Sequence, residues 1–323
     1  MHRDHPTSVN TGPHFARNVL VVAVAVAMIS AGTYVVVTSK PAVKASGITV
    51  LATFFPVYEF ARNIGGDRIN VSLLVPMTLD VHAFEPTPSS VQAVATANVL
   101  IYNGAGLEPW IPGIVAAADN SGLVLVDASA NISLLQVPPA FQKENRTIDP
   151  HVWLNPVLAK QQVANILEGL INADAVNRAY FTANAQAYDA KLDVLHGEFV
   201  NLTDSPATRY FVTFHEAFAY FAAQYNLTQI PIAGPFEEDP TPTEIQSVID
   251  AIHAHRLCYV GYESLENPAI SQSIASQTNA TLIRLDPIEG LSVTDQALGK
   301  TYLVKMQDDF TGFALALNHV GCS

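Results

Sequence analysis

The sequence is poor in several features that would assign it to a common protein class. Only 14% of its 323 residues are charged, and 16 Lys and Arg stand against 29 Asp and Glu, which gives a formal net charge of −13. This excess of acid disfavours nucleic acid and anionic membrane surfaces as partners and favours the attraction of cations. Low-complexity segments and strict short repeats are missing, and so is the HExxH string of many zinc hydrolases.

Cysteine is scarce as well. The chain has two cysteines, Cys258 and Cys322, both in its C-terminal half. No cysteine stands directly after the apolar N-terminal run, which excludes a lipid anchor of the lipoprotein type. Outside the cytoplasm such a pair is more often bridged than free, so we predict a disulfide bond. A bridge that closes so long a loop stabilises the fold by about 4 kcal/mol in the chain-entropy model.

The N-terminus carries a long uncharged, mostly apolar run at 19–37. Roughly twenty such residues are enough to span a bilayer, and Arg3 and Arg17 before the run favour an N-terminus on the cytoplasmic side. We expect residues 1–45 to form a membrane anchor and tether, with a cleaved signal peptide as the alternative. In either case the folded part lies outside the cytoplasm, at the cell surface or in the periplasm.

The rest of the chain alternates short β-rich runs with helical patterns, which is typical of βαβ units and parallel sheets. The predicted strands are 48–53, 70–75, 99–102, 123–127, 209–213, 230–236, 258–261 and 281–285. The predicted helices include 57–64, 157–173, 215–227, a helix from 242 with Thr241 as its cap, and about 295–318.

One further helix, at about 175–202, is too long to fit inside a small lobe. It would measure about 40 Å, and we interpret it as a strut between two lobes. The chain length also favours two globular lobes. We therefore predict an α/β protein with lobes at 46–173 and 204–323, each a mainly parallel sheet flanked by helices, joined by one long rigid helix at 174–203.

Three histidines lie in stiff segments flanked by proline or aromatic residues. They are His82 in VHAFEPTP, His151 in DPHVWLNP and His215 in FVTFHEAF. A solvated or capping histidine needs no such surroundings, whereas imidazoles on three anchored segments indicate a shared metal ion. His82 and His215 follow predicted strands, where α/β folds place ligands, and Asp149 could accept a hydrogen bond from the imidazole of His151.

A fourth ligand should be a carboxylate. Asp286 follows the predicted strand ATLIRL and is our first candidate, and Glu263, after CYVGY, is the competitor. Three imidazoles and one carboxylate form a tetrahedral set that suits Zn²⁺. A hard cation that prefers oxygen ligands is less favoured.

These segments resemble those of the zinc and manganese solute-binding proteins of ABC transporters, over about 48–323. DVHAFEPTPSSVQAVATANVLIYNGAGLEPW is similar to the first-ligand segment, although Val81 stands where a proline is usual, and DPHVWLNP, FVTFHEAFAYFAAQYNL and LIRLDPIEGL are similar to the other three. The resemblance implies two parallel-sheet lobes with the metal between them. It also implies four metal ligands, namely His82, His151, His215 and Asp286.

Within that family, zinc-type members carry histidine at the third position and manganese-type members carry glutamate. His215 therefore implies Zn²⁺, with Mn²⁺ as the alternative. The long loop rich in histidine and acid that many zinc members have is absent here, and so is their lipid-anchor cysteine, which a membrane helix would have to replace.

We therefore predict a binding protein rather than an enzyme. A monomer would capture Zn²⁺ outside the cytoplasm and deliver it to an ABC-transporter permease and its ATPase. Four protein ligands leave no open coordination position for an activated water. The alternatives are a cell-surface adhesin with the same site and a zinc-dependent hydrolase that uses Glu216 or Glu263 as its general base.

Overall fold

The computed structural model describes Met1 and residues 47–142, 146–236 and 239–321. The anchor predicted at 19–37 and one partner of the predicted disulfide, Cys322, lie outside these residues. Within the described part of the chain, no helix is both long enough and apolar enough to cross a membrane.

The N-terminal lobe is built on a four-stranded parallel sheet with the strand order β2-β1-β3-β4. Its strands are β1 (Ile48–Ala52), β2 (Ile69–Leu73), β3 (Val99–Tyr102) and β4 (Val124–Asp127). Its helices are α2 (Phe55–Gly65), α3 (Pro88–Thr96), α4 (Ile111–Ala118) and α5 (Pro156–Ala173), with 3₁₀ turns η1 (Gly66–Arg68), η2 (Pro139–Phe141) and η3 (Val152–Leu154).

The C-terminal lobe contains two parallel strand pairs that lie against each other. β5 (Tyr210–His215) pairs with β6 (Thr228–Ala233), and β7 (Tyr259–Tyr262) pairs with β8 (Thr281–Arg284). A Cβ atom at Gly261 would lie only 2.6 Å from the carbonyl oxygen of Val212, so glycine permits the close approach of β7 to β5. The helices are α7 (Ala219–Tyr225), α8 (Pro242–His255), α9 (Ala269–Thr278), α10 (Val293–Ala297) and α11 (Tyr302–Asn318).

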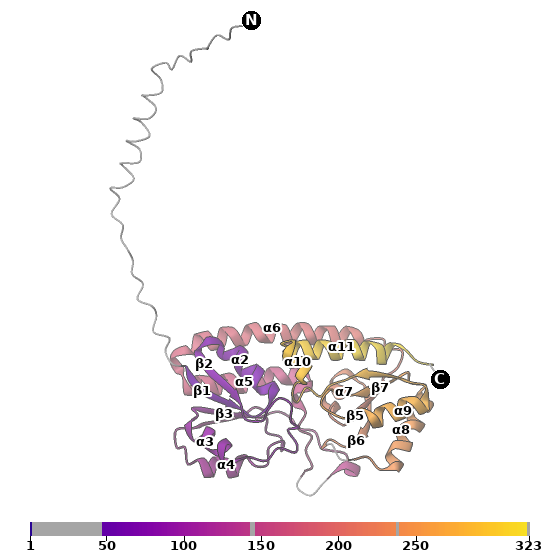
Figure 1. The fold of residues 1–323 in the computed structure, drawn as a ribbon, viewed down its shortest axis with the longest axis horizontal. Coiled ribbons are helices and arrows are strands. Elements are labelled where there is room, and N and C mark those ends of the chain that lie inside the picture. The colour runs from indigo at the N-terminus through magenta and orange to yellow at the C-terminus, as the bar shows by residue number, and fades with distance from the viewer. Residues whose placement is uncertain (2–46, 143–145, 237–238, 322–323) are drawn as a thin grey trace, which may run out of the picture. The chain divides into compact units, whose positions relative to one another are not determined.

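A single long helix, α6 (Arg178–Thr203), connects the two lobes after the short turn η4 (Ala175–Asn177). It packs against α2 and α5 of the N-terminal lobe and against α7 and α11 of the C-terminal lobe. Figure 1 shows it running along one side of the body, from the elements of the first lobe to those of the second. Its 26 residues correspond to about 39 Å of helix, so the predicted strut is present.

The hydrophobic core is continuous across both lobes. Phe60 on α2 packs edge-on against Tyr302 on α11 with 4.9 Å between ring centroids, and Phe221 on α7 stacks on Phe313 of α11 at 4.5 Å. These rings belong to one buried cluster that also includes Phe199 of α6. Residues Ala45–Ser323 accordingly form one compact unit, and the exact boundaries between the lobes stay a prediction.

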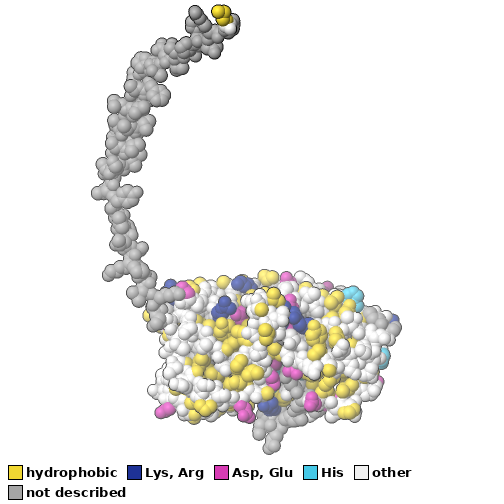
Figure 2. Space-filling model, viewed as in Figure 1, with side chains coloured by type: hydrophobic (Ala, Val, Ile, Leu, Met, Phe, Trp, Pro, Cys, Tyr) yellow, Lys and Arg dark blue, Asp and Glu magenta, His cyan; other side chains and the backbone are white. Residues whose placement is uncertain are grey.

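Charged side chains are sparse on the face of the body shown in Figure 2, and those of opposite sign are interspersed. This agrees with the low proportion of charged residues in the sequence.

The fold class is as predicted, and the differences concern individual helices. The helix predicted at 215–227 begins only at Ala219, because His215 is the last residue of β5. The helix predicted at about 295–318 is interrupted at 298–301, where Gly299 has a φ of +63° and Thr301 caps a new helix. We did not predict α4, which begins with Ile-Pro-Gly, or the polar α9.

Candidate metal centre

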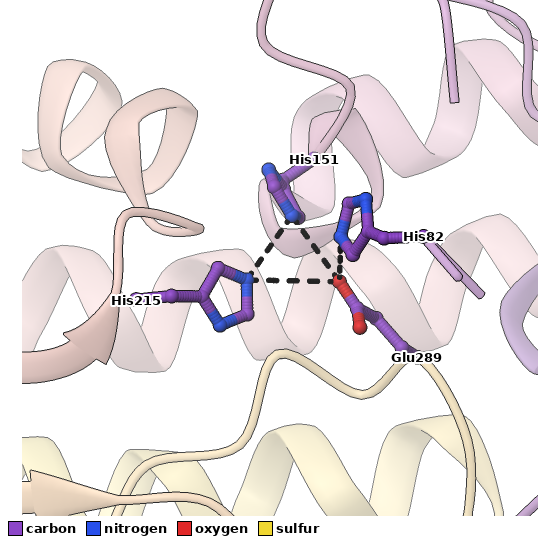
Figure 3. Close-up of side chains that lie close together, drawn as sticks. All are labelled: His82, His151, His215 and Glu289. Atoms are coloured by element: carbon purple, nitrogen blue, oxygen red, sulfur yellow. Dashed lines mark hydrogen bonds and ion pairs between the residues drawn. The ribbon is translucent and has the colours of Figure 1, made fainter. Parts of the chain in front are cut away.

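Four side chains from distant parts of the chain converge on one buried point. His82, His151, His215 and Glu289 each offer one donor atom, and these four atoms all lie within 4.8 Å of one another. Figure 3 shows the three rings and the carboxylate pointing toward a common centre. The structure therefore brings together the three histidines that the sequence singles out, and the carboxylate beside them is that of Glu289.

The N-terminal lobe contributes two of these side chains. His82 lies in the loop after β2, and its backbone N–H donates to the carboxylate of Asp80 at 2.6 Å. The backbone N–H of His151 donates to Asp149 Oδ1 at 2.9 Å. Asn103, which follows β3, donates from its side chain to the carbonyl that precedes His151 at 2.9 Å. The backbone at His151 is thereby fixed to the end of the parallel sheet.

The C-terminal lobe contributes the other two. His215 ends β5, and its backbone N–H donates to Glu263 Oε1 at 3.1 Å. Glu289 lies in the loop between β8 and α10. The residue before it, Ile288, has a φ of +59°, which is a strained conformation for a β-branched residue. This turn aims the side chain of Glu289 at the histidines.

The distances between the donor atoms fit a tetrahedral metal ion. Glu289 Oε1 lies 3.0 Å from His82 Nε2, 3.2 Å from His151 Nε2 and 3.7 Å from His215 Nε2. The Nε2 atoms of His151 and His215 are 3.2 Å apart. A zinc ion with bonds of about 2.0–2.1 Å would separate its ligands by about 3.3 Å. These four of the six donor separations are thus close to those that zinc would impose, and all six lie within 4.8 Å.

Two of the imidazoles are held by carboxylates on their far side. His151 Nδ1 lies 2.8 Å from Asp149 Oδ1, as the sequence suggested, and His215 Nδ1 lies 2.8 Å from Glu263 Oε1. A carboxylate can only accept, so each Nδ1 carries the proton. In the neutral tautomer each Nε2 then directs a lone pair at the centre. Lone pairs that face one another at this distance need a cation or protons between them.

Without a metal, protons take that place. Burial by itself lowers the pKa of His151, but the carboxylates of Asp149 and Glu289 outweigh it and raise the pKa to about 9. Burial likewise lowers the pKa of His215, and Glu263 reverses the direction. Burial raises the pKa of Glu289, but the neighbouring histidines hold it well below its usual range. The centre is therefore built to hold positive charge.

Asp286, which we predicted as the fourth ligand, does not lie with the three histidines. Its carboxylate forms a short ion pair with the buried Lys305 and accepts hydrogen bonds from the backbone N–H and the hydroxyl of Ser264, at 2.8 and 2.9 Å. The physical reason is the turn that follows. β8 ends at Arg284, Asp286 points toward α11, and the backbone reverses at Ile288 before Glu289 reaches the site.

Glu263, the competing candidate, is also placed beside the centre rather than in it, because it holds His215. Glu289 was missed because we looked for a carboxylate directly after a strand. A signal for it was present in the sequence: Lys305 lies in the apolar stretch YLVKM, and a buried lysine demands an acidic partner. That partner is Asp286, and the next acid of DPIEG, Glu289, is the carboxylate that lies with the three histidines.

A family model described as "Zinc-uptake complex component A periplasmic" matches residues 50–315. The chain belongs to this family. Its members are extracytoplasmic zinc-binding components of ABC-type zinc uptake, and the family consists of substrate-binding transport proteins rather than enzymes. The zinc hydrolase that we considered as an alternative is therefore excluded. The family description names zinc as the metal that is taken up, and the four clustered side chains of this chain could hold such an ion.

Two known proteins illustrate the likeness in sequence. The high-affinity zinc uptake system protein ZnuA of Bacillus subtilis is 30% identical over 275 residues, which cover 82% of this chain and 86% of that protein. The zinc-binding lipoprotein AdcA of Streptococcus pneumoniae is 27% identical over 271 residues, which cover 80% of this chain but only 54% of AdcA. This chain thus spans about half the length of AdcA.

Solved structures agree with these matches. The Zn(II)-bound ZnuA-like domain of AdcA superposes with a TM-score of 0.74 at 26% identity, covering 85% of this chain and all of that domain. The laminin-binding protein Lmb of Streptococcus agalactiae, described as a bifunctional protein with adhesin and metal-transporting activity, superposes with a TM-score of 0.76 at 27% identity. The superposition covers 84% of this chain and all of Lmb. Parallel-sheet lobes joined by a long helix are therefore the family's architecture.

Proposed function

We propose that this protein captures Zn²⁺ with His82, His151, His215 and Glu289 and delivers it to the permease and ATPase of an ABC importer. The observation that carries the proposal is the convergence of three imidazole nitrogens and one carboxylate oxygen at the spacing of a zinc coordination shell. Membership of the zinc-uptake family supports the same assignment.

The chemistry of the donors favours zinc over manganese. Imidazole nitrogen suits Zn²⁺, whereas Mn²⁺ prefers shells richer in carboxylate and water oxygen. Three neutral imidazoles and one carboxylate would leave a zinc site with a formal charge of +1. Asp149 and Glu263, both buried, contact the far sides of two ligands and supply further negative charge. The charge of the ion is thereby compensated in a site with little access to water.

The remaining features of the proposal concern how the protein is held outside the cell. We propose that residues 19–37 tether the monomeric body to the membrane, since a basic, then apolar, N-terminus precedes it. We also propose a disulfide between Cys258 and Cys322. Leu257 pairs with Val320 in an antiparallel bridge, and the N–H of Gly321 donates to the carbonyl of Arg256 at 2.8 Å. The chain at Val320 and Gly321, directly before Cys322, therefore runs beside the segment that leads into Cys258.

The test is the metal content of the purified chain after exposure to equal concentrations of zinc and manganese, measured by mass spectrometry. We expect one zinc per chain, lost in His151→Ala and retained in His253→Ala, because His253 is exposed on α8. Manganese in place of zinc would assign the protein to the manganese branch. A lack of stoichiometric metal, or equal metal in both variants, would overturn the proposed site.

A further inference from the structure

A cluster of buried opposite charges lies behind the loop that carries Glu289. Lys305 on α11 is fully buried and forms ion pairs with Asp286 and, at 3.1 Å, with Asp295. Asp295 also pairs with Lys300 at 3.0 Å, and Arg284 lies 3.5 Å from Asp286. Three of the chain's 16 cationic residues gather here. Burying a lysine is costly unless it is paired, so this arrangement is a specific one.

This cluster holds the first half of the loop at several points. The carboxylate of Asp286 accepts from the backbone and the hydroxyl of Ser264, and the backbone N–H of Asp286 donates to Asp309 Oδ1 at 2.8 Å. One residue further, the carbonyl of Pro287 accepts from the indole N–H of Trp153 at 2.7 Å. Trp153 lies two residues after His151, so the loop is also tied to the segment of another candidate ligand.

The second half of the loop is anchored as well. The N–H of Leu291 donates to the carbonyl of Met77 at 2.8 Å, and Gly290 lies so close to that carbonyl that a Cβ would be 2.1 Å from it. Between the two anchors lies Ile288 with its φ of +59°. A strained residue of this kind persists only where its surroundings enforce it. The strained residue, Ile288, directly precedes the proposed ligand, Glu289.

We propose that Asp286 and Lys305 are positioning residues for metal binding, whose buried ion pair fixes the loop so that Glu289 faces the three histidines. This inference rests on the proposed function, because it assigns Glu289 as the carboxylate ligand. It also gives Asp286 a role that differs from coordination. The ion pair acts on the metal through the backbone between Asp286 and Glu289.

Asp286→Asn is the sharpest variant, since it removes the charge and keeps the size of the side chain. Without the ion pair the loop samples other conformations, and Glu289 is no longer presented in its binding position. Changes to groups that orient metal ligands typically weaken metal affinity by about 10–100-fold. We expect a loss of that size in zinc affinity. The stoichiometry should stay at one zinc per chain, because all four proposed ligands remain.

The experiment compares zinc affinity, measured by competition with a chromophoric chelator, in the full chain and its variants. Asp286→Asn, Lys305→Met and the double variant form a double-mutant cycle. Asp193→Asn is the control, because Asp193 pairs with Lys160 at 2.6 Å on the surface. The visible absorption of the Co²⁺-loaded proteins reports the coordination shell. Melting of the metal-free proteins separates loss of stability from loss of affinity.

We expect Asp286→Asn to bind more weakly with an unchanged cobalt spectrum at saturation, and the double variant to lose no more affinity than Asp286→Asn alone. Lys305→Met leaves Asp286 with only the partly exposed Arg284 as a cationic partner. If this variant fails to fold, Asp286→Asn and the double variant carry the test. Asp193→Asn should bind as the unsubstituted chain does.

Three results would overturn the inference. Unchanged zinc affinity in Asp286→Asn would show that the ion pair does not position the ligand. A cobalt spectrum altered at saturation, as expected for Glu289→Gln, would make Asp286 a ligand itself. An equal loss in Asp193→Asn would point to a general effect of charge. By contrast, the proposed function fails separately if the unsubstituted chain binds no stoichiometric zinc, and this inference then fails with it.

Discussion

In the proposed metal centre, each lobe supplies one histidine whose ring is held by a buried carboxylate and one further donor from the loop after a strand. His151 in the N-terminal lobe and His215 in the C-terminal lobe are completely buried, and each imidazole is held at Nδ1 by a buried carboxylate at 2.8 Å. His82 and Glu289 lie in the loops after β2 and β8 and contact each other at 3.0 Å. The firmly held pair therefore defines the centre, and the loop pair completes it.

The loop donors differ from each other in how they are supported. His82 is fixed near its backbone by Asp80 and contacts Glu289 through Nε2 at 3.0 Å. Glu289 has behind it the buried ion pair of Asp286 and Lys305. Because the lobes share one hydrophobic core and one long helix, exchange of metal should begin with movement of the loop donors rather than with separation of the lobes.

The largest expected effect comes from removing a firmly held donor. His151→Ala and His215→Ala should each weaken zinc binding by more than about 100-fold, beyond the range of changes to groups outside the coordination shell. His82→Ala should cost less, because a water molecule can replace a donor on a loop more readily. Competition titrations measure all three. A greater loss of zinc affinity in His82→Ala than in the other two variants would contradict the view that His151 and His215 define the centre.

The pH dependence should follow from the protons that the centre holds without metal. Burial lowers the pKa of His151, but Asp149 and Glu289 raise it to about 9, so zinc must displace a proton at any lower pH. Affinity should fall by up to about tenfold per pH unit for each proton displaced as the pH drops below 9. Zinc titrations between pH 9 and 6 test this, and a constant affinity would contradict it.

The stability of the metal-free protein should change in the opposite direction. A raised pKa in the folded state contributes stability that is complete below the unfolded pKa of about 6.5 and is lost as the pH rises to about 9. Loss of the His151 contribution should therefore lower the melting temperature of the metal-free chain as the pH rises through this interval. The same scan of His151→Ala should lack that contribution. Identical profiles for the two proteins would refute the assignment of the raised pKa.

A smaller effect should follow from the carboxylates that hold the imidazoles. Asp149→Asn and Glu263→Gln each replace a charged acceptor by a neutral one, so each should weaken zinc binding by about 10–100-fold. Because the two contacts have the same length of 2.8 Å, the losses should be similar. A large loss of zinc affinity in only one of the two variants would show that the two lobes do not support their histidines equally.

The smallest expected effect on zinc affinity comes from a change outside the proposed centre, which serves as a reference. Thr241 caps α8 and forms a capping box with Glu244. Thr241→Ala should lower the free energy of unfolding by about 1 kcal/mol and leave zinc affinity unchanged. Denaturant unfolding and a zinc titration on the same preparation check both parts. A weakened zinc affinity would mean that stability and binding cannot be separated in this fold.

Sequence patterns predicted much of the fold because its regular elements follow local rules. Periodicity gave the strut at α6, and Thr241 before Pro242 gave the start of α8. The three histidines were recognisable because proline and aromatic neighbours mark stiff segments. These features depend on residues close together in the chain.

The fourth donor could not be assigned in the same way. Asp286 and Glu289 are only three residues apart, and the choice between them depends on a left-handed turn at Ile288 and on Lys305, a residue on a later helix. Neither the turn nor the ion pair has a local pattern, since isoleucine rarely adopts positive φ. The contacts of Asp149 and Glu263 with the imidazoles differ in the same respect. The first spans two residues and was anticipated, and the second spans 48 and was not.

The most direct test of the account is a crystal structure of the zinc-loaded protein with anomalous scattering measured at the zinc absorption edge. The account predicts one strong peak with Nε2 of His82, His151 and His215 and a carboxylate oxygen of Glu289 at about 2.0–2.1 Å. Asp286 should remain paired with Lys305. A peak coordinated by Asp286 or Glu263, or a peak away from the three histidines, would contradict it.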